Sequence, residues 1–160
     1  MHDLDTSECL KTFQGHSQRV RSVKFLNDNQ IVSCSDDKSI KLWDIATGNC
    51  IKTLLGHSKE VYRIAILSNN IIVSCSLDKS IRFWDVESGV CIKTLLGHSG
   101  EVWSIAILSN STIATGSSDR SIRIWDVESG DCIKILNGHT KEVNTIVKHS
   151  NESVLSGSGD

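Results

Sequence analysis

Proline is absent from this 160-residue sequence, whereas average usage of about 5% would place about eight in a chain of this length. Proline-rich linkers and ligand segments are therefore excluded. The sequence also lacks a run of about 18 apolar residues, and its first residues are acidic where a signal peptide would be basic and then apolar. We therefore expect neither a membrane span nor secretion, and an intracellular protein of the cytoplasm or nucleus.

An excess of positive charge is also lacking. Seventeen Lys and Arg stand against nineteen Asp and Glu, for a formal net charge of -2. Nucleic acids and anionic membranes are therefore not expected partners, because their affinity for proteins depends on basic surfaces. The 39% of hydrophobic residues is enough to fold a globular domain.

What the sequence does contain is a repeat with a period of 41 residues. Gly-His dipeptides begin at Gly15, Gly56, Gly97 and Gly138, and Trp-Asp dipeptides begin at Trp43, Trp84 and Trp125. Within the second unit, short apolar runs at 61–67, 71–76, 80–85 and 90–95 are separated by turn residues, which predicts a four-stranded antiparallel meander. Because these strands carry apolar residues on both faces, each sheet needs cover from neighbouring repeats.

With Gly-His near the start and Trp-Asp near the end of each unit, the chain resembles the WD-repeat β-propeller family. The resemblance implies an all-β fold over residues 3–160, with three complete four-stranded antiparallel blades and one incomplete blade. Units begin at residues 15, 56, 97 and 138, the last one truncated. Residues 3–14 are expected to form the last strand of a preceding blade.

Each unit also repeats a His, a Ser or Thr and an Asp. These are the residue types of a hydrolytic triad, but a set copied into every unit indicates a structural need that every unit has. In the WD-repeat family the matching residues form a hydrogen-bonded chain with the Trp of the third strand. By this resemblance the sets are His16, Ser33, Asp37 and Trp43; His57, Ser74, Asp78 and Trp84; His98, Thr115, Asp119 and Trp125; and His139, Ser156 and Asp160.

The six cysteines follow the repeat and form no C-x-x-C pair, so we expect buried free thiols rather than zinc ligands or disulfides. We expect no metal and no cofactor.

A spacing anomaly marks the positions where function can differ between units. Val61 and Ile64 are three residues apart, as are their equivalents in the other units, and strand alternation would place them two apart. A β-bulge after the valine explains this spacing. In the WD-repeat family this position faces the mouth of the central channel, on the usual partner-binding face. It is occupied here by Arg21, Tyr62, Trp103 and Asn144, and the residue before each valine is Arg19, Glu60, Glu101 and Glu142.

These eight residues are the candidate partner-binding set, since Trp, Tyr and Arg are enriched at interface hot spots. The alternative is that the aromatic residues pack between blades and the charges are solvated. The sequence predicts a non-catalytic scaffold or adaptor that binds other proteins or peptides. One alternative is the substrate-recognition part of a ubiquitin-ligase-type complex, which the two arginines support weakly. Others are an enzyme with a site in the channel, for which His2 and His149 are poor candidates, and a structural spacer without a partner.

The incomplete fourth unit leaves blade edges unpaired, which predicts self-association. A fragment of a longer protein is favoured over two copies assembling toward an eight-bladed ring, and the total number of blades remains open.

Overall fold

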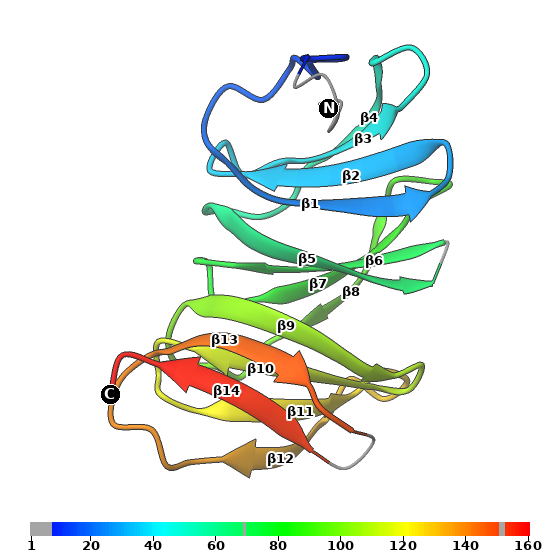
Figure 1. Cartoon of the computed structure of the whole chain (residues 1–160). Coiled ribbons are helices and arrows are strands. Elements are labelled where there is room, and N and C mark those ends of the chain that lie inside the picture. The colour runs from blue at the N-terminus through cyan, green and yellow to red at the C-terminus, as the bar shows by residue number, and fades with distance from the viewer. Residues whose placement is uncertain (1–7, 69, 151–152) are drawn as a thin grey trace.

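The computed structural model describes residues 8–68, 70–150 and 153–160, and every regular element among them is a β-strand. Three four-stranded antiparallel sheets and one two-stranded sheet follow one another as a stack of blades (Figure 1). The described part of the chain holds no helix with the length and apolar character that a membrane crossing requires.

The strands of each blade are consecutive in the sequence and hydrogen-bond in sequence order. The expected runs of the second unit match their strands to within a residue or so at each end. The first blade is β1 (Val20–Asn27), β2 (Gln30–Ser35), β3 (Ile40–Asp44) and β4 (Cys50–Leu54); the second is β5 (Val61–Ser68), β6 (Ile71–Ser76), β7 (Ile81–Asp85) and β8 (Cys91–Leu95). The third is β9 (Val102–Ser109), β10 (Thr112–Ser117), β11 (Ile122–Asp126) and β12 (Cys132–Leu136); the fourth is β13 (Val143–Lys148) and β14 (Val154–Ser158).

Each first strand carries the predicted bulge. In the second blade, Val61 lies opposite Ser76 and Arg63 opposite Cys75, so Tyr62 is the extra residue. The same register shift follows Val20, Val102 and Val143. A bulge turns its extra side chain out of the alternation of the strand. Each blade therefore has one side chain that leaves the strand alternation. It lies at the same end of the sheet as the turn that follows the second strand.

The blades are held together by apolar faces that meet between neighbouring sheets. Val32 and Leu42 of the first blade belong to one buried cluster with Val61, Ile72 and Trp84 of the second. Full burial of such side chains stabilises by roughly 1.5–3 kcal/mol each. A single blade would expose these faces, so the stack is the folding unit.

The turn between the third and fourth strands of each four-stranded blade requires glycine. Gly89 has a φ of 76°, which side chains with a Cβ rarely adopt, and a Cβ there would lie 2.8 Å from Cδ of Lys52 in the preceding blade. That approach allows Lys52 Nζ to donate to the main-chain oxygen of Val86 at 3.1 Å. The turn thus ties one blade to the next.

The segment before the first blade departs from expectation. Residues 3–7 lie outside the described range, and residues 8–14 form no regular strand apart from an isolated bridge at Cys9. They nevertheless occupy the place of a fourth strand beside the first blade, since Lys11 Nζ donates to the Ile45 oxygen at 3.0 Å, as Lys52 does to Val86 one blade later. No described third strand lies alongside to supply ladder hydrogen bonds, so the segment follows the blade without pairing.

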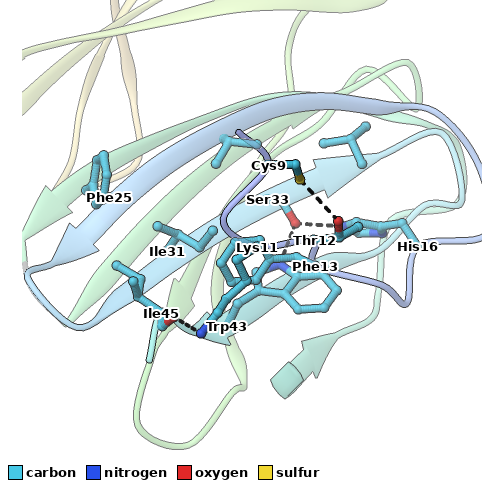
Figure 2. Close-up of a pocket in the computed structure, with 12 residues that line it drawn as sticks. Cys9, Lys11, Thr12, Phe13, His16, Phe25, Ile31, Ser33, Trp43 and Ile45 are labelled. Carbon is cyan, nitrogen blue, oxygen red and sulfur yellow. Dashed lines mark hydrogen bonds between the residues drawn. The ribbon is translucent and has the colours of Figure 1, made fainter. Parts of the chain in front are cut away.

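The outward face of the first blade remains uncovered. Val23 is 53% exposed, whereas its equivalent in the second blade, Ile64, is 3% exposed. Together with Phe13, Phe25 and Trp43 it lines an apolar cavity of about 490 Å³ (Figure 2). This face is built like the buried ones, but no blade formed by the described residues packs against it.

Candidate protein-interaction face

A hydrogen-bonded chain joins the repeated polar residues in each blade. In the second blade, His57 Nδ1 lies 2.8 Å from Asp78 Oδ2, and His57 Nε2 lies 2.8 Å from Ser74 Oγ. Trp84 Nε1 donates to the same Ser74 oxygen at 2.8 Å. The chain therefore connects the loop before the first strand, the second strand and the third strand.

The structure brings together the corresponding residues of the other blades. The fourth set is more exposed and has no Trp among its contacts, because its described residues end with Asp160. The distances of the first set are His16–Asp37 2.8 Å, His16–Ser33 2.8 Å and Trp43–Ser33 2.8 Å; of the third, His98–Asp119 2.8 Å, His98–Thr115 2.8 Å and Trp125–Thr115 2.7 Å; and of the fourth, His139–Asp160 3.0 Å and His139–Ser156 2.8 Å.

The aspartate of each set fastens two loops at once. Asp78 accepts from the backbone nitrogen of Ser58 at 3.0 Å through Oδ2 and from that of Ser80 at 3.0 Å through Oδ1. Burial alone would raise the pKa of this carboxyl, but the hydrogen bonds from His57 and Ser80 outweigh burial and hold it well below its usual range. The carboxylate is thus charged and held by its donors.

These sets resemble a hydrolytic triad in residue type and distance, but their surroundings do not suit catalysis. Ser74 is fully buried and His57 is 6% exposed, so a substrate has no access to the hydroxyl oxygen. That oxygen also accepts a hydrogen bond from Trp84. In the third set, burial lowers the pKa of His98 despite the opposing effect of Asp119. The sets therefore serve to hold loops on a rigid sheet.

The bulge residues of the first three blades form a ladder. The Arg21 guanidinium lies 4.9 Å from the centroid of the Tyr62 ring, and Tyr62 stacks on Trp103 with ring centroids 6.0 Å apart and an interplanar angle of 28°. Arg21 Nε also donates to Asp36 Oδ1 at 2.6 Å. In the fourth blade, Asn144 is exposed and has no side-chain hydrogen bond to the described residues. Three side chains that differ between repeats thus meet in one row across three blades.

One polar atom of this ladder lacks a partner. Trp103 Nε1 is buried and has no hydrogen-bond acceptor among the described residues. An unpaired buried donor costs about 1–3 kcal/mol, so an acceptor at this position would be favourable.

The residues that precede the valines connect the loop to the neighbouring turn through their backbone. The main-chain oxygens of Arg19, Glu60 and Glu101 accept from the nitrogens of the turn residues Asp36, Leu77 and Ser118 at 2.9, 3.0 and 2.9 Å. Their side chains make no ion pair with one another among the described residues. Arg19 and Glu142 are exposed, whereas Glu60 and Glu101 are half-buried.

Sequence reasoning missed a second row of variable residues. Asp36, Leu77, Ser118 and Gly159 precede the shared aspartate in the four units, and Asp36 is the acceptor that holds Arg21. The signal was available, since four different residues stand at one repeat position.

The six cysteines are free thiols, but only Cys34 and Cys75 are buried. The expectation of burial is wrong for the other four, which are exposed or half-buried: Cys9, Cys50, Cys91 and Cys132. No group of three or more His, Cys, Asp or Glu with metal-binding geometry occurs among the described residues. Burial raises the pKa of the Cys34 thiol to about 12, which keeps it protonated. Nothing in the described part of the chain assembles a ligand set for a metal.

Stacked four-stranded antiparallel blades, each closed by the same His–Ser/Thr–Asp–Trp chain, define a segment of a β-propeller. Comparison with known families agrees, because the family described as "WD domain, G-beta repeat" matches residues 7–44, 48–85, 89–126 and 130–160. The chain belongs to the WD-repeat family.

A solved structure, the WD40 β-propeller domain of Doa1, is similar to this one with a TM-score of 0.87 and 30% identity. The match covers 92% of this chain and 50% of that chain. Our chain therefore spans half of the solved protein that it resembles.

Curated relatives match over single repeats only. E3 ubiquitin-protein ligase COP1 of Arabidopsis thaliana is 42% identical over 45 residues, which is 28% of this chain and 7% of that protein. Pre-mRNA-processing factor 17 of Saccharomyces cerevisiae is 45% identical over 38 residues, 23% of this chain and 8% of that protein. WD repeat-containing protein 89 homolog of Dictyostelium discoideum is 36% identical over 45 residues, 28% of this chain and 12% of that protein. These matches show the repeat and no particular role.

Proposed function

We propose that this protein is a non-catalytic scaffold that binds another protein or a peptide through the ladder of Arg21, Tyr62 and Trp103 and the charged residues beside it. WD40 propeller domains are in general interaction modules without catalytic activity. The observation that carries the proposal is the ladder itself, because residue types typical of hot spots gather at the one bulge position that varies between blades.

The scaffold explains why such a row would bind well. The bulges lie on strands that are held by the buried His–Ser/Thr–Asp–Trp chains, so the row is ordered before a partner arrives. Binding then loses little conformational entropy.

The alternatives receive less support. At the ladder, a recognition site for phosphorylated substrates would need free guanidinium groups, but Arg21 is paired with Asp36 at 2.6 Å. A channel enzyme would need an acid or base there, whereas His149 lies in an exposed segment bonded to Ser153 and His2 is outside the described residues. The role of a ubiquitin-ligase component therefore rests on a local match alone. The intracellular location remains part of the proposal.

A quantitative pull-down from cell extract tests the proposal. We expect Trp103→Ser to reduce recovery of a specific partner at least about tenfold, in line with the loss of a hot-spot residue. Ile92→Ser and Ile133→Ser are matched controls, since both side chains are more than half exposed on fourth strands.

Because Trp103 is half-buried, Asn144→Ala and Glu142→Ala serve as exposed variants that should fold normally. Circular dichroism checks the fold of every variant. If Trp103→Ser, Asn144→Ala and Glu142→Ala recover the partner as well as the two isoleucine controls do, this row of side chains serves packing and is not a binding site.

A further inference from the structure

A second cavity lies on the inner side of the stack, where the four first strands follow one another. β1, β5 and β9 each contact the first strand of the next blade (Figure 1). Lys24 of β1 and residues 145–148 of β13 line the same cavity of about 300 Å³, although two blades separate these strands in the sequence. The stack thus curves around this cavity.

Basic side chains from three blades meet there. Lys24, Arg63 and Lys148 line the cavity, and all three are exposed. Neither Lys24 nor Arg63 has a side-chain hydrogen bond or ion pair within the described residues, and Lys148 Nζ donates only to the Leu108 main-chain oxygen, at 2.5 Å. No carboxylate is among the described lining residues. Three cations therefore share one concave site with nothing to neutralise them.

The hydroxyl groups of the cavity add donors of the same kind. Ser104 Oγ accepts from the backbone nitrogen of Ile146 at 3.0 Å, which leaves its proton available for another acceptor. Thr145 is exposed on β13, and its hydroxyl group has no hydrogen bond to the described residues. The cavity thus offers hydrogen-bond donors together with positive charge.

The basic residues are not imposed by the repeat. The position of Arg63 is serine or threonine in the other units, namely Ser22, Ser104 and Thr145. The position of Lys24 is apolar in the other units, namely Ala65, Ala106 and Val147. The blade folds with small or neutral residues at both places, so the charges answer no need of the scaffold.

We infer that this inner cavity binds a phosphate group, with Arg63, Lys24 and Lys148 as its cationic contacts and Ser104 and Thr145 as hydroxyl donors. The Arg fork suits a pair of phosphate oxygens, and Lys supplies a point charge. Donors that arrive from several blades suit a tetrahedral group with oxygens in several directions better than a planar carboxylate. The concave wall strengthens the attraction, because a cleft lined by one sign of charge focuses its field.

Isothermal titration calorimetry of the full chain tests the site with inorganic phosphate and tripolyphosphate as free anions and with a phosphoserine peptide in a neutral Gly/Ser background. We expect Arg63→Ser to weaken binding at least about tenfold, as the loss of a charge-assisted hydrogen bond would. Lys24→Ala should also weaken it. Both variants copy residues that other units of this chain carry, so they should fold.

Lys134→Ala is the matched control, because it removes one positive charge from an exposed position on β12, away from the cavity. It should keep the affinity of the unmodified protein. Shifts of the Ser104 and Thr145 amide signals in NMR spectra would locate the bound anion.

Binding of tripolyphosphate without the peptide supports the inference with a free phosphorylated molecule as ligand, and tighter binding of the peptide supports it with a phosphorylated partner segment as ligand. The inference is overturned if none of the three probes binds, or if Arg63→Ser and Lys134→Ala bind equally well. These outcomes are independent of the ladder, whose variants are read out by partner recovery.

Discussion

The guanidinium group of Arg21 lies 4.9 Å from the centre of the Tyr62 ring, so two side chains that vary between repeats join the first blade to the second. A cation over an aromatic face contributes about 0.5–1 kcal/mol at exposed sites and more where water is excluded. Asp36 holds the guanidinium from the side at 2.6 Å, which fixes its orientation. The contact is therefore both an inter-blade link and part of the proposed interaction face.

A double-mutant cycle between these two residues should show this coupling. We expect Arg21→Gln and Tyr62→Leu together to destabilise less than the sum of the single changes, by about 0.5–1 kcal/mol. Urea unfolding measures the free energies. Arg21→Gln with Asn144→Ala provides a control pair without a described contact, which should be additive. Additivity of Arg21 and Tyr62 would contradict the coupling.

The shared hydroxyl in each blade can be tested with the chain's own variation. Ser74→Ala should lower the free energy of unfolding by about 1–3 kcal/mol for each partner it strands, here Trp84 Nε1 and His57 Nε2. Ser74→Thr should be nearly neutral, because Thr115 makes the same contacts in the third blade.

Ser156→Ala should cost less than Ser74→Ala, because Ser156 is exposed and bonds no Trp in the structure. Thermal and urea unfolding measure all three variants. Equal losses for Ser156→Ala and Ser74→Ala would mean that burial of the network does not matter.

Stability should fall as the pH is lowered, through His98 first. Burial lowers the pKa of this imidazole below its usual 6.5, although Asp119 opposes the shift. As the pH drops below 6.5, His98 of the unfolded chain takes up a proton that the native ring does not, so the native state loses stability. We expect the urea concentration at the midpoint of unfolding to decrease when the pH is lowered from about 7.5 to about 5.5.

A second loss should follow in stronger acid. The pKa of Asp78 is held low by its hydrogen bonds against the effect of burial, so the unfolded carboxyl binds a proton before the native one does, from about pH 4 downward.

NMR titration of the His98 ring is the direct measurement for the loss of stability near neutral pH. A ring midpoint above 6.5 would show that Asp119 prevails over burial and would reverse the predicted sign.

The fourth blade depends on a glycine in the third. A Cβ added at Gly116 would lie 2.8 Å from Val143 Cγ1 and 3.0 Å from Ile146 Cδ1. Gly116→Ala should therefore destabilise by about 1–3 kcal/mol and loosen β13. Hydrogen exchange of the Val143–Lys148 amides measures the loosening. Gly159→Ala is the control, since its nearest heavy atom is 3.5 Å away. Unchanged exchange in Gly116→Ala would mean that the sheets can separate slightly without loss.

Much of the architecture was predictable from the sequence because each unit repeats the same local code. Alternating apolar residues and turn residues placed the strands, and the three-residue spacing of Val61 and Ile64 placed the bulge. The spacing of His57, Ser74 and Asp78 recurs in every unit, which pointed to a shared structural role. These features depend on neighbouring residues or on the repeat period, and both can be read from one sequence.

Contacts between different positions of the repeat, within one blade or between blades, were not predictable. The pairing of Arg21 with Asp36 joins two positions that the repeat pattern treats separately. Residues 3–14 were expected to form the last strand of a preceding blade, but the described residues 8–14 form only an isolated bridge at Cys9, because a strand exists only where a neighbouring strand supplies its hydrogen bonds. The inner cavity depends on the curvature of the stack, which brings Lys24 and Lys148 to one site.

The sequence by itself determined the blades, their bulges and the His–Ser/Thr–Asp–Trp sets, because strand pattern and turn chemistry act over a few residues and repeat at a fixed period. The tertiary structure alone decided which variable side chains meet. The stacking of Arg21, Tyr62 and Trp103 and the gathering of unpaired cations on the inner wall depend on the distance and angle between neighbouring sheets. That geometry is set by how their buried faces pack, and the apolar pattern identifies those faces without fixing the distance and angle between them.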